Sequence, residues 1–284
     1  MARVERSLVG GRRSSIMTET LVISSLQNAT VRNIVRLRDN RQRQREHVVI
    51  VDGVSEIQRA INAGLAIQAV FVSVESNLAT ESLVQQVPKS VVRVTEPVLS
   101  KIAFGQHHRD AVALFEEPRR SLQDLRLGVM PFVVVLDRIE KPGNVGAVFR
   151  SADAIGADAV VICEGGCDLF NPSVIRASLG TIFAVPAAQA NRTDTIAWLR
   201  QHECKIVSAR VDAKSCYWDI DYRQSIAIVI GSEANGLGEQ WRRSDLESSL
   251  SIDVCIPMRG SADSLNASVS AALLMFEAQR QRLR

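Results

Sequence analysis

Three segments of this 284-residue sequence combine glycines with polar side chains of the kinds that bind ligands or take part in chemistry. They span residues 137–150, 228–238 and 256–268, and each includes or follows the end of a short apolar run that is typical of a buried strand. Open α/β sheets bind their ligands just beyond the carboxyl ends of the strands. We therefore expect these segments to contribute to a ligand site.

The first segment predicts a turn, the start of a helix and a contact to phosphate. Pro142-Gly143 makes the turn, and Asn144 is a good N-cap for the helix that follows. Arg150 falls in the second helical turn, where the helix dipole does not favour a cation, whereas a phosphate suits its forked donors. The Gly143 to Gly146 spacing is not a dinucleotide fingerprint, so we reject a nicotinamide cofactor.

The second segment is a glycine-rich loop that holds one carboxylate, Glu233. The glycines at 231, 236 and 238 permit close approach of a ligand to the backbone. Taken alone, such a loop is more readily interpreted as a strained turn.

The third segment leads from a strand through Pro257 and a polar loop into the last helix. Ser264 lies where it can cap that helix, which places Asn266 inside the first turn, where its helix propensity is poor. A residue that breaks a local rule at a strand-to-helix junction is a candidate functional residue.

Taken together and in this order, the three segments resemble the three motifs of the SpoU (TrmH-like) branch of the SPOUT RNA 2′-O-ribose methyltransferases. The resemblance covers residues 130–284, and residues 22–74 look like the substrate-binding domain that often precedes this catalytic domain. One departure is Gly231-Ser232-Glu233-Ala234, where the family commonly has Gly-Asn-Glu-Gly. Ser232 keeps a hydroxyl and Ala234 is small, so we expect the activity to be retained and only the geometry of the loop to differ from that of the family.

The resemblance implies S-adenosylmethionine as methyl donor, no metal, and a trefoil knot that holds the donor in a bent shape. The implied cofactor-binding positions are Gly231, Ile256, Leu265, Ile230, Gly236, Met258 and Ser268. The implied catalytic positions are Asn144, Arg150, Glu233, Ser264 and Asn266. A glycine loop beside apolar residues at strand and helix ends also suits an adenine pocket.

Methyl transfer to a ribose hydroxyl needs an in-line approach and removal of a proton from a weak acid. The family's proposed base or activator is the arginine at position 150, yet arginine stays protonated in nearly all settings. We therefore expect Arg150 mainly to pair with the RNA phosphate and to orient the 2′-hydroxyl. Glu233 is expected to orient its loop and a neighbouring arginine.

The charge distribution points to an acidic polymer as partner. Residues 1–46 hold ten arginines and four acids, which gives +6, whereas the whole chain carries +3. A solvated helix face gives the same composition, but only RNA presents a 2′-hydroxyl, so we expect an RNA-binding arm with salt-dependent affinity. Its predicted phosphate contacts are Arg32, Arg36, Arg38, Arg41, Arg43 and Arg45.

The elements that must position these residues alternate between strands and helices, which predicts a mostly parallel sheet with helices on both faces. A smaller α/β RNA-binding domain precedes it. Expected strands are 47–51, 67–74, 91–94, 132–136, 159–163, 205–211, 226–230 and 252–256, and expected helices are 28–46, 54–63, 144–155, 172–181, 193–203 and 265–282. The predicted organisation is a flexible tail (1–20), a substrate-binding domain (21–112), a linker (113–129) and a methyltransferase domain (130–284). Translation starts at Met1 or at Met17.

Bulk properties fit a cytoplasmic globular protein. The sequence is 46% hydrophobic, yet no apolar run approaches the roughly 20 residues of a membrane span, and no secretory signal is visible. Five scattered cysteines predict ordinary thiols rather than disulfides or a zinc site. The resemblance also implies a homodimer formed through the C-terminal domain. The last helix, with Met275 and Phe276, suits such an interface or plain core packing.

Ribosomal RNA, the large subunit favoured, is the expected substrate by analogy with two-domain relatives. Transfer RNA is the alternative substrate. A non-catalytic RNA-binding or ribosome-assembly factor of the same fold is a second alternative, which detectable binding of S-adenosylmethionine would disfavour. A small-molecule nucleotide enzyme is disfavoured because the chain lacks a phosphate loop.

Overall fold

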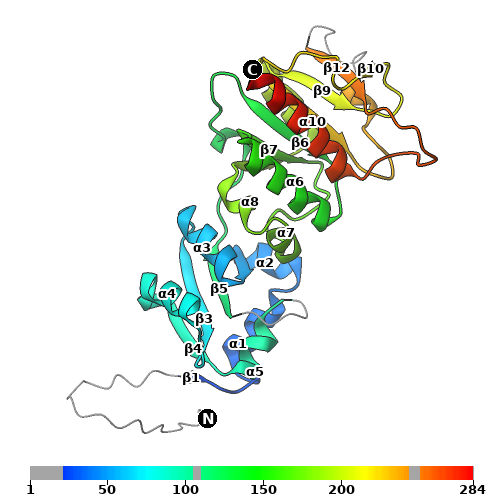
Figure 1. Ribbon diagram of the computed structural model, residues 1–284. Coiled ribbons are helices and arrows are strands. Elements are labelled where there is room, and N and C mark those ends of the chain that lie inside the picture. The colour runs from blue at the N-terminus through cyan, green and yellow to red at the C-terminus, as the bar shows by residue number, and fades with distance from the viewer. Residues whose placement is uncertain (1–21, 105–109, 243–249, 284) are drawn as a thin grey trace, which may run out of the picture.

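Two α/β units follow one another along the chain in the computed structural model, which describes residues 22–104, 110–242 and 250–283 (Figure 1). The first is built on a five-stranded sheet in the order β1-β4-β3-β5-β2, and the second on a seven-stranded sheet in the order β10-β12-β9-β11-β6-β7-β8. The predicted α/β fold class is confirmed. The predicted tail, residues 1–20, lies outside the described residues, and the implied knot stays a prediction.

The first sheet is mixed, because β5 runs antiparallel between β2 and β3. Its strands are β1 (Val22–Ile23), β2 (Val48–Asp52), β3 (Ile67–Ser73), β4 (Val91–Val94) and β5 (Ala111–Glu116). Its helices are α1 (Ala29–Arg36), α2 (Asn40–Glu46), α3 (Val54–Asn62), α4 (Leu78–Gln86) and α5 (Glu96–Ile102), with a 3-10 turn η1 (Pro88–Ser90). The sheet thus extends through β5 into residues 113–116, which the sequence had placed in a linker.

The predicted basic helix over residues 28–46 is wrong in one respect, because it is two helices rather than one. The chain leaves α1 at Leu37, and Asp39 caps α2 by accepting a 2.7 Å hydrogen bond from the Arg41 backbone N–H. An aspartate that bonds the backbone two residues ahead favours a new helix start over continuation of the old helix. Arg32 and Arg36 therefore lie on α1, whereas Arg41, Arg43 and Arg45 lie on α2.

All strand pairs of the second sheet are parallel. Its strands are β6 (Phe132–Asp137), β7 (Ala159–Cys163), β8 (Ala187–Ala190), β9 (Lys205–Ala209), β10 (Ser215–Cys216), β11 (Ile226–Gly231) and β12 (Ser251–Cys255). Its helices are α6 (Pro142–Ile155), α7 (Pro172–Ala177), α8 (Thr181–Ala184), α9 (Arg192–Gln201) and α10 (Ala267–Arg282), with 3-10 turns η2 (Leu122–Asp124) and η3 (Glu239–Trp241). All six residues of β6 are buried, as its continuous apolar run predicted.

Helices cover both faces of this sheet, as predicted. Val134 and Leu136 of β6 pack in one cluster with residues of α6 and α10, whereas Val133 and Val135 pack on the other face with Trp198 of α9. The alternation follows from the two-residue period of a strand. All carboxyl ends of the parallel strands therefore open on one edge of a sheet buried on both sides.

One continuous hydrophobic core joins the two units. Ile57 of α3 and Ile182 of α8 belong to the same buried cluster, and α3 packs against α8 while β2 packs against α7. A 2.7 Å ion pair between Arg176 and the buried Asp52 crosses the same junction. Apolar contact supplies most of the attraction, and the ion pair adds direction.

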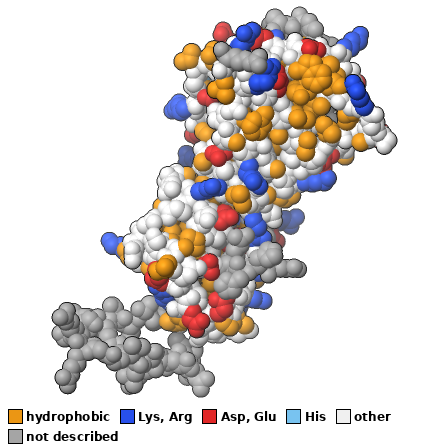
Figure 2. Space-filling model, viewed as in Figure 1, with side chains coloured by type: hydrophobic (Ala, Val, Ile, Leu, Met, Phe, Trp, Pro, Cys, Tyr) orange, Lys and Arg blue, Asp and Glu red, His pale blue; other side chains and the backbone are white. Residues whose placement is uncertain are grey.

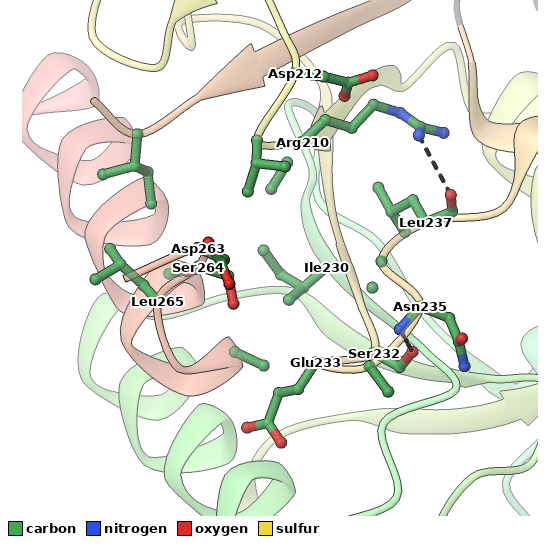
Figure 3. Close-up of a pocket in the computed structure, with 18 of the residues that line it drawn as sticks. Arg210, Asp212, Ile230, Ser232, Glu233, Asn235, Leu237, Asp263, Ser264 and Leu265 are labelled. Carbon is green, nitrogen blue, oxygen red and sulfur yellow. Dashed lines mark hydrogen bonds between the residues drawn. The ribbon is translucent and has the colours of Figure 1, made fainter. Parts of the chain in front are cut away.

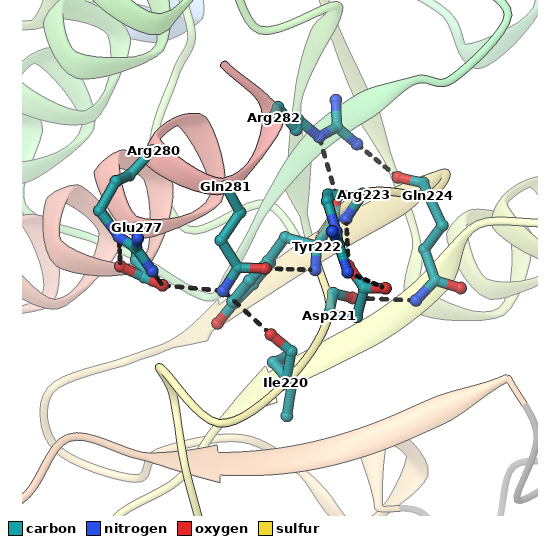
Figure 4. A network of polar contacts seen from close by, with 9 residues as sticks. All are labelled: Ile220, Asp221, Tyr222, Arg223, Gln224, Glu277, Arg280, Gln281 and Arg282. Carbon is teal, nitrogen blue, oxygen red and sulfur yellow. Dashed lines mark hydrogen bonds and ion pairs between the residues drawn. The ribbon is translucent and has the colours of Figure 1, made fainter. Parts of the chain in front are cut away.

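The last helix begins later than predicted. Asn266 is the N-cap of α10, accepting hydrogen bonds from the backbone N–H groups of Ser268 and Val269, so Ser264 is not its cap. An asparagine there obeys the capping rule instead of breaking it. The helix end is fixed by Gln281, which donates to the Ile220 carbonyl and accepts from the Tyr222 N–H (Figure 4).

All five cysteines are free, in agreement with the prediction of ordinary thiols. Burial raises the pKa of Cys163 to about 12, so this thiol stays protonated at neutral pH. Within the described ranges, no helix is both long and apolar enough to cross a membrane.

Candidate active site

Four polar side chains from all three motif segments meet at the carboxyl edge of the second sheet. Asn144 donates to Glu233, and Lys141 forms an ion pair with the same carboxylate. Asn266 Nδ2 lies 3.1 Å from both Asn144 Oδ1 and Glu233 Oε1. Three of these residues were predicted, and the structure brings them together.

The start of α6 explains the position of Asn144. The helix begins at Pro142 with Lys141 as N-cap, so the prediction that Asn144 caps it is wrong. Proline is well suited to the first helical position because its missing N–H would have no helical partner there. Asn144 therefore lies within the first turn and projects its side chain toward Glu233. Sequence analysis assigned no role to Lys141, although a cation beside a turn that faces a lone carboxylate was a usable signal.

Glu233 is held in its ionised form. The hydrogen bond from Lys141 has the largest effect and keeps the pKa of Glu233 below its ordinary value, with a further contribution from Asn144, while desolvation opposes both. An ionised carboxylate only accepts hydrogen bonds. Glu233 therefore acts as an anchor for two amides and an ammonium group.

The glycine loop folds tightly back on itself after β11. The Gly236 N–H donates to the Ser232 carbonyl at 2.8 Å, and Gly236 has a φ of +60°. A Cβ on Gly231 would lie 2.4 Å from the Gly236 carbonyl carbon and 2.5 Å from the Leu237 nitrogen. Residue 231 must therefore be glycine for the loop to close over the strand end.

Two arginines that were not singled out from the sequence contact this loop and the η3 turn that follows it. Arg210 donates to the carbonyls of Leu237 at 3.2 Å and Gly238 at 2.8 Å. Arg192 pairs with the fully buried Asp137 at 3.0 Å and reaches Gln240 at 3.4 Å. The signal available for the second pair was Asp137 itself, since a charge that ends a buried strand requires a partner.

A cavity of about 580 Å³ lies beside the polar cluster, between β9, β11, β12 and the start of α10 (Figure 3). Glu233 borders both the cavity and the cluster. Six of the seven predicted cofactor-binding residues line it, namely Ile230, Gly231, Gly236, Ile256, Met258 and Leu265. The seventh, Ser268, instead donates its hydroxyl to Asn266 Oδ1 at 2.7 Å. Ser264 also lines the cavity but takes no part in the cluster.

Arg150 is not part of this assembly. It lies in the third turn of α6, not the second, because the helix starts at Pro142. Its side chain is exposed and forms no hydrogen bond or ion pair with any described residue. Within one copy of the chain, its guanidinium is therefore free for another partner.

The arginines of the predicted arm differ in whether they bind other parts of the chain. Those at positions 32, 36, 41 and 45 are exposed on α1 and α2. Arg38 donates to the carbonyls of Lys101 and Ala103 and lies over the Phe104 ring. The Arg43 side chain is only 5% exposed and pairs with Asp168 at 2.7 Å, so it joins the domains and is not presented to solvent.

Comparison with known families accounts for this arrangement. A family model described as the SpoU rRNA Methylase family matches residues 131–276. The chain belongs to this family. A second model, the MRM3-like substrate binding domain, matches residues 28–113 of this SpoU methylase.

Named relatives of this SpoU methylase extend over nearly its whole length. It is 24% identical over 254 residues to the 23S rRNA (guanosine(2553)-2′-O)-methyltransferase RlmP of Bacillus subtilis, covering 89% of this chain and 97% of the relative. It is 28% identical over 267 residues to the 23S rRNA (uridine(2479)-2′-O)-methyltransferase of Streptomyces viridochromogenes, covering 90% and 91%. The solved structure of the SpoU methyltransferase AviRb from Streptomyces viridochromogenes in complex with AdoMet matches with a TM-score of 0.83 and 27% identity, over 90% of this chain and 99% of that one.

Proposed function

We propose that this protein transfers a methyl group from S-adenosylmethionine to a ribose 2′-hydroxyl of large-subunit ribosomal RNA. The observation that carries the proposal is the cluster of Asn144, Glu233 and Asn266 at the border of the loop cavity. Family membership supports the reaction, and the names of the relatives support the class of RNA. The two named relatives act on different nucleotides, so the target position is particular to each protein.

The cavity residues fit the methyl donor. Apolar side chains of Ile230, Ile256 and Leu265 offer walls for a flat adenine ring, and the turn at Gly231 exposes backbone groups to a ligand. Bound there, S-adenosylmethionine supplies an electrophilic methyl group. Arg210 holds the glycine loop and Arg192 reaches the η3 turn that follows it, so less of this segment has to be ordered when the donor binds.

The polar cluster serves to position the acceptor. Glu233 has a lowered pKa and already accepts hydrogen bonds from three side chains, which makes it a poor base. It holds the amides of Asn144 and Asn266 in fixed directions beside the cavity. A ribose hydroxyl placed against these amides would be aligned for in-line attack, and alignment of this kind supplies a large part of a rate enhancement.

A second copy of the chain would complete the site. Arg150 is exposed and stands apart from the cluster within one copy, so we assign its phosphate contact to the site of the partner. The outer face of α10 offers an interface, because Val269, Leu273 and Phe276 are 47%, 37% and 47% exposed. Figure 2 shows hydrophobic side chains gathered over this part of the C-terminal domain.

Of the two residues of the last helix named from the sequence, Phe276 thus lies on its exposed side with Val269 and Leu273, whereas Met275 is fully buried in the core. The Gln281 contacts fix the inner side of α10 and keep the outer face in place (Figure 4). An exposed apolar face on a well-anchored helix favours a homodimer.

The arm would hold the RNA backbone through the exposed arginines of α1 and α2, with Arg41 and Arg45 nearest to the catalytic domain along the chain. Arg43 is left out of this role because it is buried in an ion pair. We place the activity in the cytoplasm.

Mapping of 2′-O-methylation in total RNA, with and without the protein, tests the proposal. We expect one ribose of large-subunit RNA to lose its methyl group when the protein is absent, and Glu233→Gln to lower turnover about a hundredfold through misplaced amides. The matched control is Glu75→Gln, an exposed glutamate of the first domain, which should behave as wild type. Loss of methylation only in transfer RNA, or no calorimetric binding of S-adenosylmethionine, would contradict the proposal.

A further inference from the structure

A second cavity, of about 390 Å³, lies where the two domains meet and shares no lining residue with the donor cavity. Asn40 and Gln44 of α2 form one wall. The opposite wall includes Glu164 and Asp168, which follow β7, and Gln189 of β8. A volume of this size lies within the range of small-ligand pockets.

The walls of this junction cavity are held in fixed positions. Arg43 of α2 pairs with Asp168 at 2.7 Å and also donates to the carbonyls of Leu37 and Arg38. Glu164 has a φ of +56° and accepts a 2.7 Å hydrogen bond from the Arg192 N–H. A charged pair with so little exposure costs desolvation, and its use here fixes the orientation of α2 relative to the sheet.

The polar groups of the cavity that have no partner among the described residues include both donors and acceptors, which suits the edge of a nucleobase. The Gln44 side chain forms no hydrogen bond with any described residue, so both ends of its amide are available. Gln189 uses its amide nitrogen on the Cys167 carbonyl, which leaves its oxygen as an acceptor, and one Glu164 oxygen is likewise open. No described lysine or arginine lines the cavity, which disfavours a phosphate, whereas base edges present both donors and acceptors.

The cavity lies on the same sheet edge as the polar cluster. Glu233 follows β11 and Glu164 follows β7, with only β6 between them in the sheet. Neighbouring strands lie roughly 4.8 Å apart, so the two strand ends are separated by about 10 Å. RNA held at the cluster therefore has its nearby nucleotides within reach of the cavity, and the exposed Arg41 and Arg45 lie on the same helix as Gln44.

We propose that the junction cavity binds an unpaired base of the RNA, a few nucleotides from the methylated ribose, and so contributes to target selection. This inference rests on the proposed function. Single-stranded RNA is read through base edges splayed into such pockets. Because both domains line the cavity, a change in the position of α2 relative to the second sheet would change which base the cavity accepts.

Ultraviolet crosslinking provides the first test, with ribosomal RNA from cells that lack the protein as the probe. We expect nucleotide adducts on peptides that contain residues 162–168 or 189–191, identified by mass spectrometry. Absence of adducts from both of these peptides would overturn the inference.

Gln44→Ala provides the second test, with Gln201→Ala, an exposed glutamine at the end of α9, as matched control. The Gln44 side chain is exposed and makes no hydrogen bond with the described residues, so its loss should not affect folding. We expect KM for the RNA to rise about tenfold, with kcat and the Kd for S-adenosylmethionine unchanged. The slope of RNA affinity against salt should also be unchanged, whereas Arg41→Ala should reduce it by about one.

If the wild-type protein methylates the RNA and Gln44→Ala leaves KM unchanged, the base-binding inference is overturned. Absence of methylation by the wild-type protein overturns the proposed function instead.

Discussion

Asn266 connects three parts of the site through one side chain. Its amide nitrogen reaches Asn144 and Glu233, while its oxygen accepts from the backbone of Ser268 and Val269 at the start of α10. The residue therefore combines a structural role as helix cap with a positioning role toward the acceptor. Substitution can separate the two roles because serine caps helices about as well as asparagine but carries no amide.

We expect Asn266→Ala to lower the free energy of unfolding by about 1 kcal/mol through loss of the cap. It should also lower kcat by more than about tenfold because the amide is lost. Asn266→Ser should restore most of the stability and none of the turnover. Thermal unfolding and methyl incorporation from labelled donor measure the two effects. Recovery of turnover in the serine variant would show that capping is the whole role of Asn266.

The packing of α6 against α7 depends on a residue with no side chain. A Cβ on Gly146 would lie 2.5 Å from the Ala177 Cβ and 2.7 Å from the Ser178 nitrogen. Gly146→Ala should therefore force the helices apart and cost roughly 1–3 kcal/mol of stability. The Asn144 side chain would move with α6. Equilibrium denaturation measures the change.

Gly143→Ala is the matched control on the same helix, since nothing lies within 4 Å of its Cβ position. Alanine favours a helix over glycine, so this variant should be neutral or more stable by about 0.5–1 kcal/mol. Equal destabilisation of both variants would show that the close approach at Gly146 is not the cause.

At the level of elements, the sequence predicted most of the catalytic domain and less of the first. Strand 159–163 was predicted with its observed bounds because it is a short apolar run between glycines. β5 was missed, since an antiparallel strand between two others has no separate signal in a pattern of alternating strands and helices. Asn144 was found as an expected helix cap, Glu233 as the carboxylate of the glycine-rich loop, and Asn266 from its poor helix propensity in the first turn where the sequence placed it. Arg210 and Arg192 were not found, because an arginine that supports a loop from another strand or helix is visible only once the fold brings them together.

The oligomeric state is the prediction that concerns the whole molecule. If α10 forms the dimer interface, Leu273→Glu should place a charge in an apolar contact and convert dimer to monomer. Methyl transfer should fall with it, because Arg150 would no longer reach a second site. Leu78→Glu, at a leucine that is 90% exposed in the first domain, is the matched control and should stay dimeric. Sedimentation velocity distinguishes these outcomes, and a wild-type monomer would refute the interface.

The continuous core of the two domains also affects how the chain is made. Domains emerge from the ribosome in order, the N-terminal one first. The apolar surface around Ile57 is complete early, yet its partners, Ile175 of α7 and Ile182 of α8, are synthesised only later. Until then, the nascent first domain carries a bare hydrophobic face, the kind of surface that chaperones bind. The first domain would therefore need a chaperone during synthesis, until α7 and α8 of the second domain cover this face.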